Sequence, residues 1–265
     1  MSVGIFPENV RLKPIALPVE HGGWGFILEP LLVGLAVAPS LTGLLVALGA
    51  IAGFLFRQPI RIVWTDFASD RDGPRTHAAV VIAGFYFVLA CTFLTVAIVR
   101  EHAILVPLAA ALPAGAAVLA LDTMKKSRTL TAEILGPIAL GSTGAAVAIG
   151  GGLSLTMAFV IWALVAARAI PAILYVRARL RLEYGEPWGL AAPITSHVAA
   201  VALSSSLAFA GLVAHVVSLV YLVLLTRAAC GLSRLRRPLS AKAVGFTEIG
   251  WGLFTIVSLA VLLRL

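Results

Sequence analysis

Apolar runs of about the length that crosses a bilayer recur along most of this chain, and this feature limits the folds open to it. A transmembrane helix needs roughly 20 predominantly apolar residues. Reading the runs between turn and charge signals predicts nine spans, near residues 21–38, 41–57, 77–99, 102–121, 131–149, 154–176, 189–211, 213–230 and 243–263. The sequence therefore predicts an all-α polytopic membrane protein, built as a bundle of nine transmembrane helices.

Composition excludes an ordinary soluble domain. The 265 residues are 60% hydrophobic and only 12% charged, whereas about a quarter of the residues in a soluble domain are charged. Because no polar stretch is longer than a loop, we expect residues 1–265 to form a single integral membrane domain. Residues 1–20 lack the apolar core of a signal peptide and are expected to be a cytoplasmic or interfacial lead-in.

The basic residues follow the predicted spans. If the chain starts in the cytoplasm, only Arg100 and Arg264 of the twenty basic residues face outward. This asymmetry is what the positive-inside rule requires, and it predicts a multipass protein of the bacterial cytoplasmic (inner) membrane with a cytoplasmic N-terminus and an external C-terminus. The net charge of +8 then indicates topology and contact with anionic lipid headgroups rather than binding of nucleic acid.

The first cytoplasmic joint, "WTDFASDRDGPRT" at residues 64–76, is rich in charge. Asp66 and Asp70 are four residues apart and share one face if they lie on a helix. Two carboxylates so placed suit Mg2+, which takes one or two protein carboxylates and fills its shell with water and phosphate oxygens. Asp72 lies off that face, before a Gly-Pro pair that stops a helix. The alternative is a solvated loop whose acids pair with its own two arginines.

The second joint predicts an anion site. Lys125, Lys126 and Arg128 precede two threonines that are suited to capping the next helix. A helix N-terminus beside three cations attracts anions. The alternative is that these cations serve only as an orientation signal.

The third joint, "LYVRARLRLEYGEPW", places Arg177 and Arg181 on one helical face and Tyr175 on a neighbouring one. Guanidinium groups suit phosphate oxygens, so this joint is a second candidate for phosphate binding. The alternative is snorkelling of arginines at a helix end.

Arg168, Glu29 and Glu248 lie inside predicted spans, where charge is costly and indicates a functional site or a buried pair. Arg168 lies well within an apolar run, and we expect it to face the bundle interior and to pair with an acid or a backbone carbonyl. Glu29 must be protonated, paired or functional. The same requirement applies to Glu248, which lies closer to a polar end of its span. His21, at the membrane entry, is typical of an interfacial anchor.

Two family resemblances rest on these residues. The motifs P-x-E-H-G-G-W and E-P-x-x-x-G resemble those of the YwiC-like family of bacterial multipass proteins, whose name implies no activity. "FRQPIR" and the arginines at 177–181 fit the same family. The motif positions are Pro18, Glu20, His21, Gly22, Trp24, Glu29, Pro30 and Gly34.

The second resemblance is to the UbiA superfamily of intramembrane prenyltransferases. Its members have nine helices and two aspartate-rich motifs that bind a polyprenyl diphosphate through Mg2+ on the cytoplasmic side. "DFASD" occupies the position of the first motif and "MKKSRT…GPIALG" is similar to the Lys/Arg-Thr loop before helix 5. The chain departs from the pattern where Ile62 and Val63 replace the leading Asn-Asp, and where the second motif has arginines in place of aspartates.

This resemblance implies prenyl transfer from an isoprenoid diphosphate to an unspecified acceptor. It implies that Asp66 and Asp70 are the Mg2+ ligands. It also implies that Glu29 or Asp72 makes the polar contact with the acceptor. The alternative is a non-catalytic membrane protein: a lipid-diphosphate binder, a transporter or an assembly factor. The residues expected to hold the diphosphate or its lipid are Arg177, Arg181, Lys126, Arg128, Tyr175, Arg168 and His21.

Overall fold

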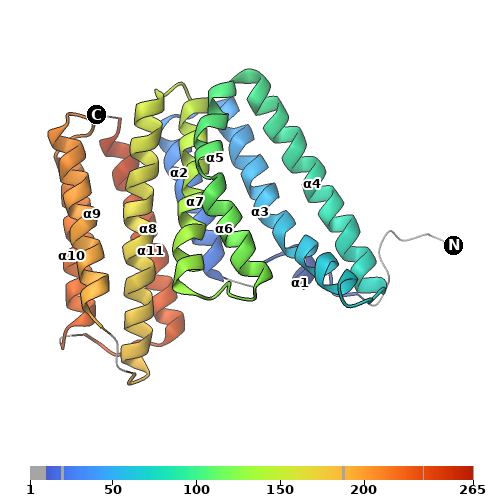
Figure 1. The fold of residues 1–265 in the computed structure, drawn as a ribbon. Coiled ribbons are helices and arrows are strands. Elements are labelled where there is room, and N and C mark those ends of the chain that lie inside the picture. The colour runs from blue at the N-terminus through green and yellow to red at the C-terminus, as the bar shows by residue number, and fades with distance from the viewer. Residues whose placement is uncertain (1–9, 19–20, 187–188, 235, 265) are drawn as a thin grey trace.

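The computed structural model describes residues 10–18, 21–186, 189–234 and 236–264, and this part of the chain is all-helical without strands (Figure 1). The helices are α1 (Lys13–Ala16), α2 (His21–Val37), α3 (Leu41–Phe67), α4 (Pro74–Arg100), η1 (His102–Ile104), α5 (Leu105–Ala110), α6 (Leu112–Thr123), α7 (Leu130–Gly150), α8 (Leu155–Glu183), α9 (Ala191–Phe209), α10 (Val216–Leu232) and α11 (Ala241–Leu262). The prediction of an all-α chain rich in apolar helices is confirmed.

Each of the nine predicted segments falls on a helix or a helix pair, but the count of nine crossings is not confirmed. Six helices within the described residues are long and apolar enough to cross a membrane: α3, α4, α7, α8, α9 and α11. A seventh crossing is formed if the pair on either side of a 50° bend, residues 102–110 and 112–123, acts as one span. α2 and α10 are apolar but have only 17 residues each, fewer than the roughly 20 that a perpendicular crossing needs.

The second predicted span was too short. It was expected to end near residue 57, but α3 continues to Phe67 and carries Pro59 in its interior. Its basic side chains remain at the surface, where Arg57 and Arg61 approach the carboxylate of Asp122 on α6 at 3.5 and 3.9 Å. Because charge on the exposed side of a helix can remain solvated, arginines at these positions do not end the helix.

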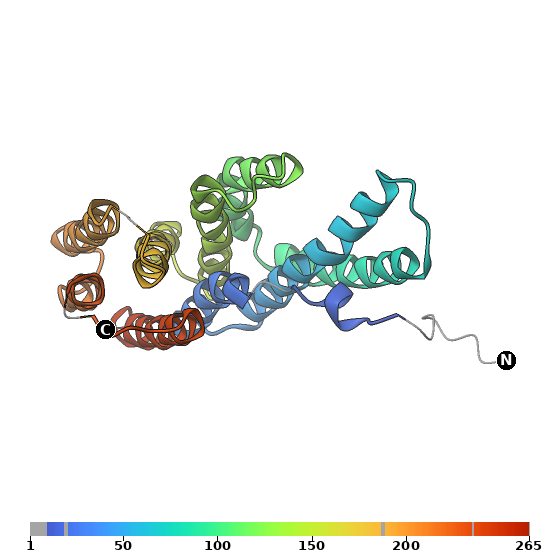
Figure 2. The same ribbon diagram turned by 90° about the horizontal axis from the view of Figure 1, so that it is seen from below.

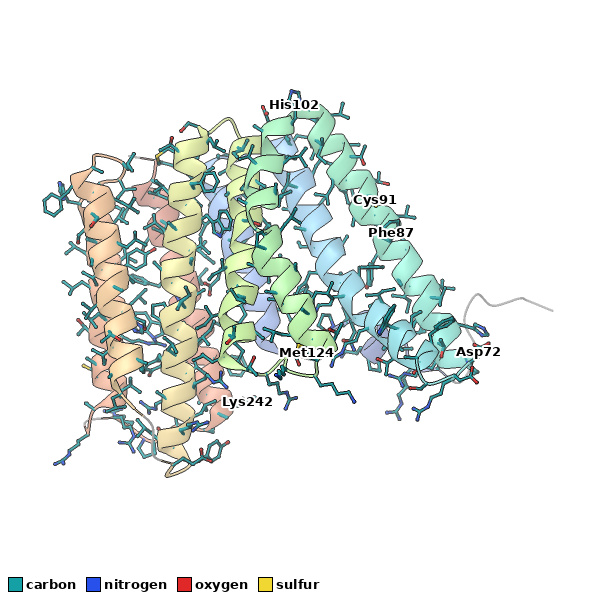
Figure 3. The ribbon with its side chains drawn as sticks, in the orientation of Figure 1. Asp72, Phe87, Cys91, His102, Met124 and Lys242 are labelled. Atoms are coloured by element: carbon teal, nitrogen blue, oxygen red, sulfur yellow. The ribbon has the colours of Figure 1, made fainter. Side chains whose placement is uncertain are left out.

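The α3–α4, α6–α7, α8–α9 and α10–α11 connections, which carry most of the basic residues, gather at one end of the bundle, which we call the basic end. Figure 3 shows Asp72, Met124 and Lys242, which mark three of these joints, at that end and His102 at the opposite end. The described part of the C-terminus also lies at the opposite end in Figure 1. The chain thus runs back and forth between a strongly basic end and an end with few basic residues.

α7 lies between two sides of the bundle. Seen from below in Figure 2, α3 and α4 extend to one side of α7, and α8 to α11 lie on the other. α7 packs on α2, α3, α6 and α8, whereas α4 packs mainly on α3. The two main apolar cores follow this division: Ile27, Val46 and Val147 belong to one, and Leu164 and Tyr221 to the other.

The crossing of α2 and α7 depends on two glycines. A β-carbon at Gly34 would lie 2.9 Å from the side chain of Val147, and one at Gly144 would lie 2.9 Å from the side chain of Pro30. The backbones therefore approach more closely than any larger residue permits, as small residues allow in membrane helices. This close crossing fixes the position of α2, which carries Glu29.

We expect Gly144→Ala to destabilise the fold by about 1–3 kcal/mol, because the added methyl group overpacks the crossing. Gly136→Ala, in the same helix, is the matched control because a β-carbon there meets no neighbour within 4 Å. That control should be neutral or stabilising by up to about 1 kcal/mol through helix propensity. Thermal unfolding of both variants in the same detergent measures the difference, and equal melting temperatures would contradict the packing argument.

Candidate functional site

A cluster of four ionisable side chains lies inside the bundle, and Arg168 joins its parts. The Arg168 side chain, only 5% exposed, brings Nη2 to 3.9 Å from Oε1 of Glu29 and 3.5 Å from Oε2 of Glu248. The same nitrogen donates a hydrogen bond of 3.3 Å to the backbone carbonyl of Glu248. The expectation that Arg168 faces the interior and pairs with an acid or a carbonyl is therefore confirmed, and both buried glutamates are paired.

The fourth member, Arg227, lies in the predicted span at residues 213–230 and was not predicted as a site residue. Its guanidinium group pairs with Glu248, lies 3.8 Å from the ring centre of Tyr175 and lies 5.6 Å from that of Trp251. Such contacts stabilise a cation over an aromatic face. An arginine three residues before the end of a predicted apolar run was the available signal, and it is easily taken for a snorkelling residue.

We call Glu29, Arg168, Arg227 and Glu248 the charge cluster. They come from α2, α8, α10 and α11, and their formal charges sum to zero. Glu29 lies about 12 Å into α2 from its first residue, and Glu248 about 10 Å into α11, at 1.5 Å per residue. Charges at such depth are tolerated when they are paired with one another.

Two glycines make room for the cluster. A β-carbon at Gly252 on α11 would occupy the place of the Glu29 carboxylate, and one at Gly231 on α10 would collide with the Tyr175 ring. Tyr175 is therefore buried against α10 and Arg227. Its predicted role in binding a diphosphate remains a prediction.

The second joint forms a separate cationic loop at the basic end, made of Lys125, Lys126 and Arg128. All three side chains are exposed, and Lys125 adopts a left-handed backbone conformation at φ 57°. Thr129 caps α7 by accepting a hydrogen bond from the amide of Ala132, which confirms the predicted cap. The loop thus combines three exposed cations with the N-terminus of a 21-residue helix.

Arg177 of α8 joins the second and third basic joints. Its Nη2 donates to the carbonyl of Arg128 at 3.4 Å, and its Nη1 lies 3.0 Å from a carboxylate oxygen of Glu133 on α7. Three of the residues expected to bind phosphate, Lys126, Arg128 and Arg177, are therefore close together. The fourth, Arg181, pairs at 3.8 Å with Glu186 in the following turn.

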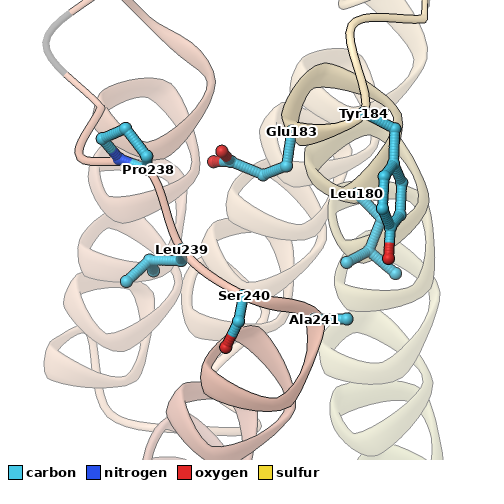
Figure 4. A pocket seen from close by; sticks show the side chains of 7 residues that line it. All are labelled: Leu180, Glu183, Tyr184, Pro238, Leu239, Ser240 and Ala241. Carbon is cyan, nitrogen blue, oxygen red and sulfur yellow. The ribbon is translucent and has the colours of Figure 1, made fainter.

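A pocket beyond Arg181 lies between the end of α8 and the segment that leads into α11 (Figure 4). Glu183 is the charged residue among those that line it in the described part of the chain. Its carboxylate lies 2.7 Å from Nε of Arg179 and 4.0 Å from Nε of Arg236. Arg179 also donates to the carbonyls of Gly231 and Arg237, so this group ties the α10–α11 connection to α8 and does not present cations to an anion.

The acidic joint is not arranged as predicted. α3 ends at Phe67, so Asp66 lies in its last turn and Asp70 follows in a turn with φ 50°. The two carboxylates therefore do not share a helical face, because the backbone between them is not helical. Asp66 is buried and accepts a hydrogen bond of 2.8 Å from the Thr76 hydroxyl. Asp72 is exposed and lies 3.2 Å from Nε2 of His77.

The Mg2+ site that the UbiA resemblance implies, with Asp66 and Asp70 as its ligands, remains a prediction, because Mg2+ takes only one or two protein carboxylates. The described residues contain no group of three or more His, Cys, Asp or Glu side chains able to hold a metal ion. Asp72 lies at the outer edge of the α3–α4 side in Figure 3, whereas Glu29 of α2 pairs with Arg168 of α8, which also pairs with Glu248 of α11. Asp72 and Glu29 thus belong to different places, and the side chain of His21 lies outside the described residues.

Comparison with known proteins identifies one family. Residues 17–148 match the model of the YwiC-like protein family. This segment, just under half of the chain, is similar to YwiC-like proteins. No curated protein and no solved structure matches the chain.

The YwiC-like segment contains the whole cationic loop but only one member of the charge cluster. It contains Glu29 and the cationic loop at residues 125–128, and it ends within α7, before α8. Arg168, Arg227 and Glu248 therefore lie outside it, although Glu29 pairs with the first of them. The charge cluster joins the YwiC-like segment to the C-terminal half of the chain.

We expect Arg168→Gln to destabilise the protein by about 3–5 kcal/mol, because it leaves two buried carboxylates with one guanidinium partner. The double variant Arg168→Gln with Glu29→Gln restores the charge balance and should recover most of this loss. Arg264→Gln, at an exposed position, is the control for losing one positive charge. Thermal unfolding in detergent measures all three, and a double variant no more stable than Arg168→Gln would rule out charge balance as the cause.

Proposed function

We propose that this protein binds the phosphate-bearing headgroup of a membrane lipid at its basic end, without transferring a prenyl group. The observation that carries the proposal is the meeting of the cationic loop with α8, through the hydrogen bond from Arg177 to Arg128. Lys125, Lys126 and Arg128 are exposed at the N-terminus of α7, where backbone N–H groups and the helix dipole favour an anion. Glu133 offsets only part of this positive charge.

A lipid is the proposed source of the phosphate because of where the loop lies. It connects two apolar helices at the end of the bundle where the basic joints gather (Figure 1). Basic residues next to membrane helices attract anionic headgroups, each contributing about 1 kcal/mol near the surface. The UbiA resemblance implies an isoprenoid diphosphate, and this lipid is the ligand we propose.

Binding without prenyl transfer is favoured by the position of the carboxylates. Asp66 accepts a hydrogen bond from Thr76 on the α3–α4 side, whereas Arg177 lies on α8 on the other side of α7. A prenyltransferase that works through Mg2+ needs carboxylates and diphosphate-binding cations at one place. Prenyl transfer with Asp66 and Asp70 as Mg2+ ligands is the competing proposal, and dependence of binding on Mg2+ distinguishes the two.

We expect Lys126→Ala with Arg128→Ala to weaken binding of farnesyl diphosphate by roughly 30-fold, which corresponds to about 2 kcal/mol for two cations. Arg234→Ala with Lys242→Ala, which removes two exposed cations from the α10–α11 connection, should have little effect. Isothermal titration of the protein in neutral-lipid nanodiscs measures binding with and without Mg2+.

Inorganic pyrophosphate in the same titration separates recognition of the diphosphate from recognition of the lipid. Weaker binding of pyrophosphate supports a lipid ligand, and equal binding contradicts it. Equal losses of affinity in the two double variants would show that general surface charge, and not the cationic loop, causes the effect. Binding that requires Mg2+ and is abolished by Asp66→Ala or Asp70→Ala would overturn the proposal in favour of a prenyltransferase.

Nine crossings, with a cytoplasmic N-terminus and an external C-terminus in a bacterial inner membrane, form the topology we propose. It requires the 17-residue helices α2 and α10 to cross together with the bent pair and the six longer helices. Reporter fusions should then place the two termini on opposite sides, with the basic end in the cytoplasm. Termini on the same side would contradict an odd number of crossings.

A further inference from the structure

We infer that the charge cluster is a proton-binding site and that the carboxylate of Glu29 is the group that takes the proton. This inference does not depend on lipid binding at the cationic loop. It rests on the unequal way in which the two carboxylates are held and on the charge balance of the cluster.

Glu248 is held more firmly than Glu29. It pairs with both Arg168 and Arg227, and its backbone carbonyl also accepts a hydrogen bond from Arg168. Glu29 has one ion pair among the described residues, at 3.9 Å, to a nitrogen that also lies 3.5 Å from Glu248. Neutralising the carboxylate of Glu29 therefore breaks fewer ion pairs than neutralising that of Glu248.

The groups that face Glu29 come from all the helices packed around α2. α8 contributes Arg168 and α11 contributes Glu248, while α7 presents Gly144 to α2. The arginines of α3 are engaged with Asp122 on α6. The hydroxyl of Tyr221 on α10 donates to the carbonyl of Leu164 at 2.7 Å. Arg168 is therefore the one cation within ion-pair distance of Glu29 among the described residues.

Glu29 is also the most accessible member of the cluster. Its side chain is 21% exposed, compared with 16% for Glu248, 9% for Arg227 and 5% for Arg168. The guanidinium groups remain protonated at acidic and neutral pH. The charge of the cluster can therefore change only at its two carboxylates, and the more exposed and less firmly held of these is Glu29.

Proton binding has a defined structural consequence. A proton from water bonds to one oxygen of the Glu29 carboxylate, forming a neutral carboxylic acid and changing the net charge of the cluster from zero to plus one. Arg168 then pairs with Glu248 alone, and the ion pair that joins α2 to α8 is lost. The position of α2 against α8 and α11 thus becomes coupled to protonation. Ionisable residues within membrane segments have this kind of role in proton relays.

Infrared difference spectroscopy between acidic and neutral pH tests this inference on the purified protein in nanodiscs. We expect the wild type to show a carboxylic-acid C=O band that appears at acidic pH and shifts in D2O. Glu29→Gln should lack one component of that band, because the amide cannot take up the proton while the other carboxyl groups of the chain titrate in both proteins. Absence of the band from the wild type, or its full retention in Glu29→Gln, would overturn the inference.

A pair of alanine variants provides a second measurement that keeps the Glu29 carboxyl group. Gly252→Ala crowds the Glu29 carboxylate, whereas a β-carbon at Gly250, two residues earlier on the same helix, meets nothing within 4 Å. The pH midpoint of the band should be displaced in Gly252→Ala and unchanged in Gly250→Ala. Identical midpoints in the two variants would show that the titrating carboxyl is not the one beside α11, and the assignment to Glu29 would be wrong.

Discussion

The balance of buried charge at Arg168 is the constraint on which the C-terminal side of the bundle depends. One guanidinium group contacts carboxylates from α2 and α11, and Arg227 of α10 completes the pairing of Glu248. Removing one partner from a buried ion pair leaves an uncompensated charge, which is strongly unfavourable in an apolar environment. The four helices therefore have to meet at this depth, and Gly252 provides the space that the meeting requires.

The pairing of Glu29 with Arg168 also depends on the packing of α2 against α7. Glu29 reaches Arg168 only because α2 lies closely against α7, where Gly34 and Gly144 allow the backbones to approach. Apolar burial gives little preference for one helix contact over another inside a bilayer, because lipid is as apolar as a leucine side chain. Close backbone packing and paired charge thus specify which helices are neighbours, and the YwiC-like segment contributes to both through α2 and α7.

Sequence predicted the features that depend on local pattern. The positions of the apolar helices, the Thr129 cap and the interior pairing of Arg168 all follow from hydrophobic run length, capping preference and the cost of buried charge. The end of α3 did not follow, because Arg57 and Arg61 remain exposed on the helix and do not end it. The arrangement of Asp66 and Asp70 did not follow either, because it depends on the turn after Phe67 and on the hydrogen bond from Thr76. The role of Arg227 also depends on partners from other helices, which periodicity along one helix cannot identify.

The charge cluster and the cationic loop differ in what they can bind, and charge balance explains the difference. In the cluster two guanidinium groups face two carboxylates, so an added anion would have to displace Glu29 or Glu248 from Arg168 or Arg227. In the loop three exposed cations have Glu133 as a nearby acid, through Arg177, and positive charge remains for a ligand. An anionic headgroup therefore belongs at the basic end, whereas the change that the cluster accommodates most readily is the arrival of a proton at its least firmly held carboxylate.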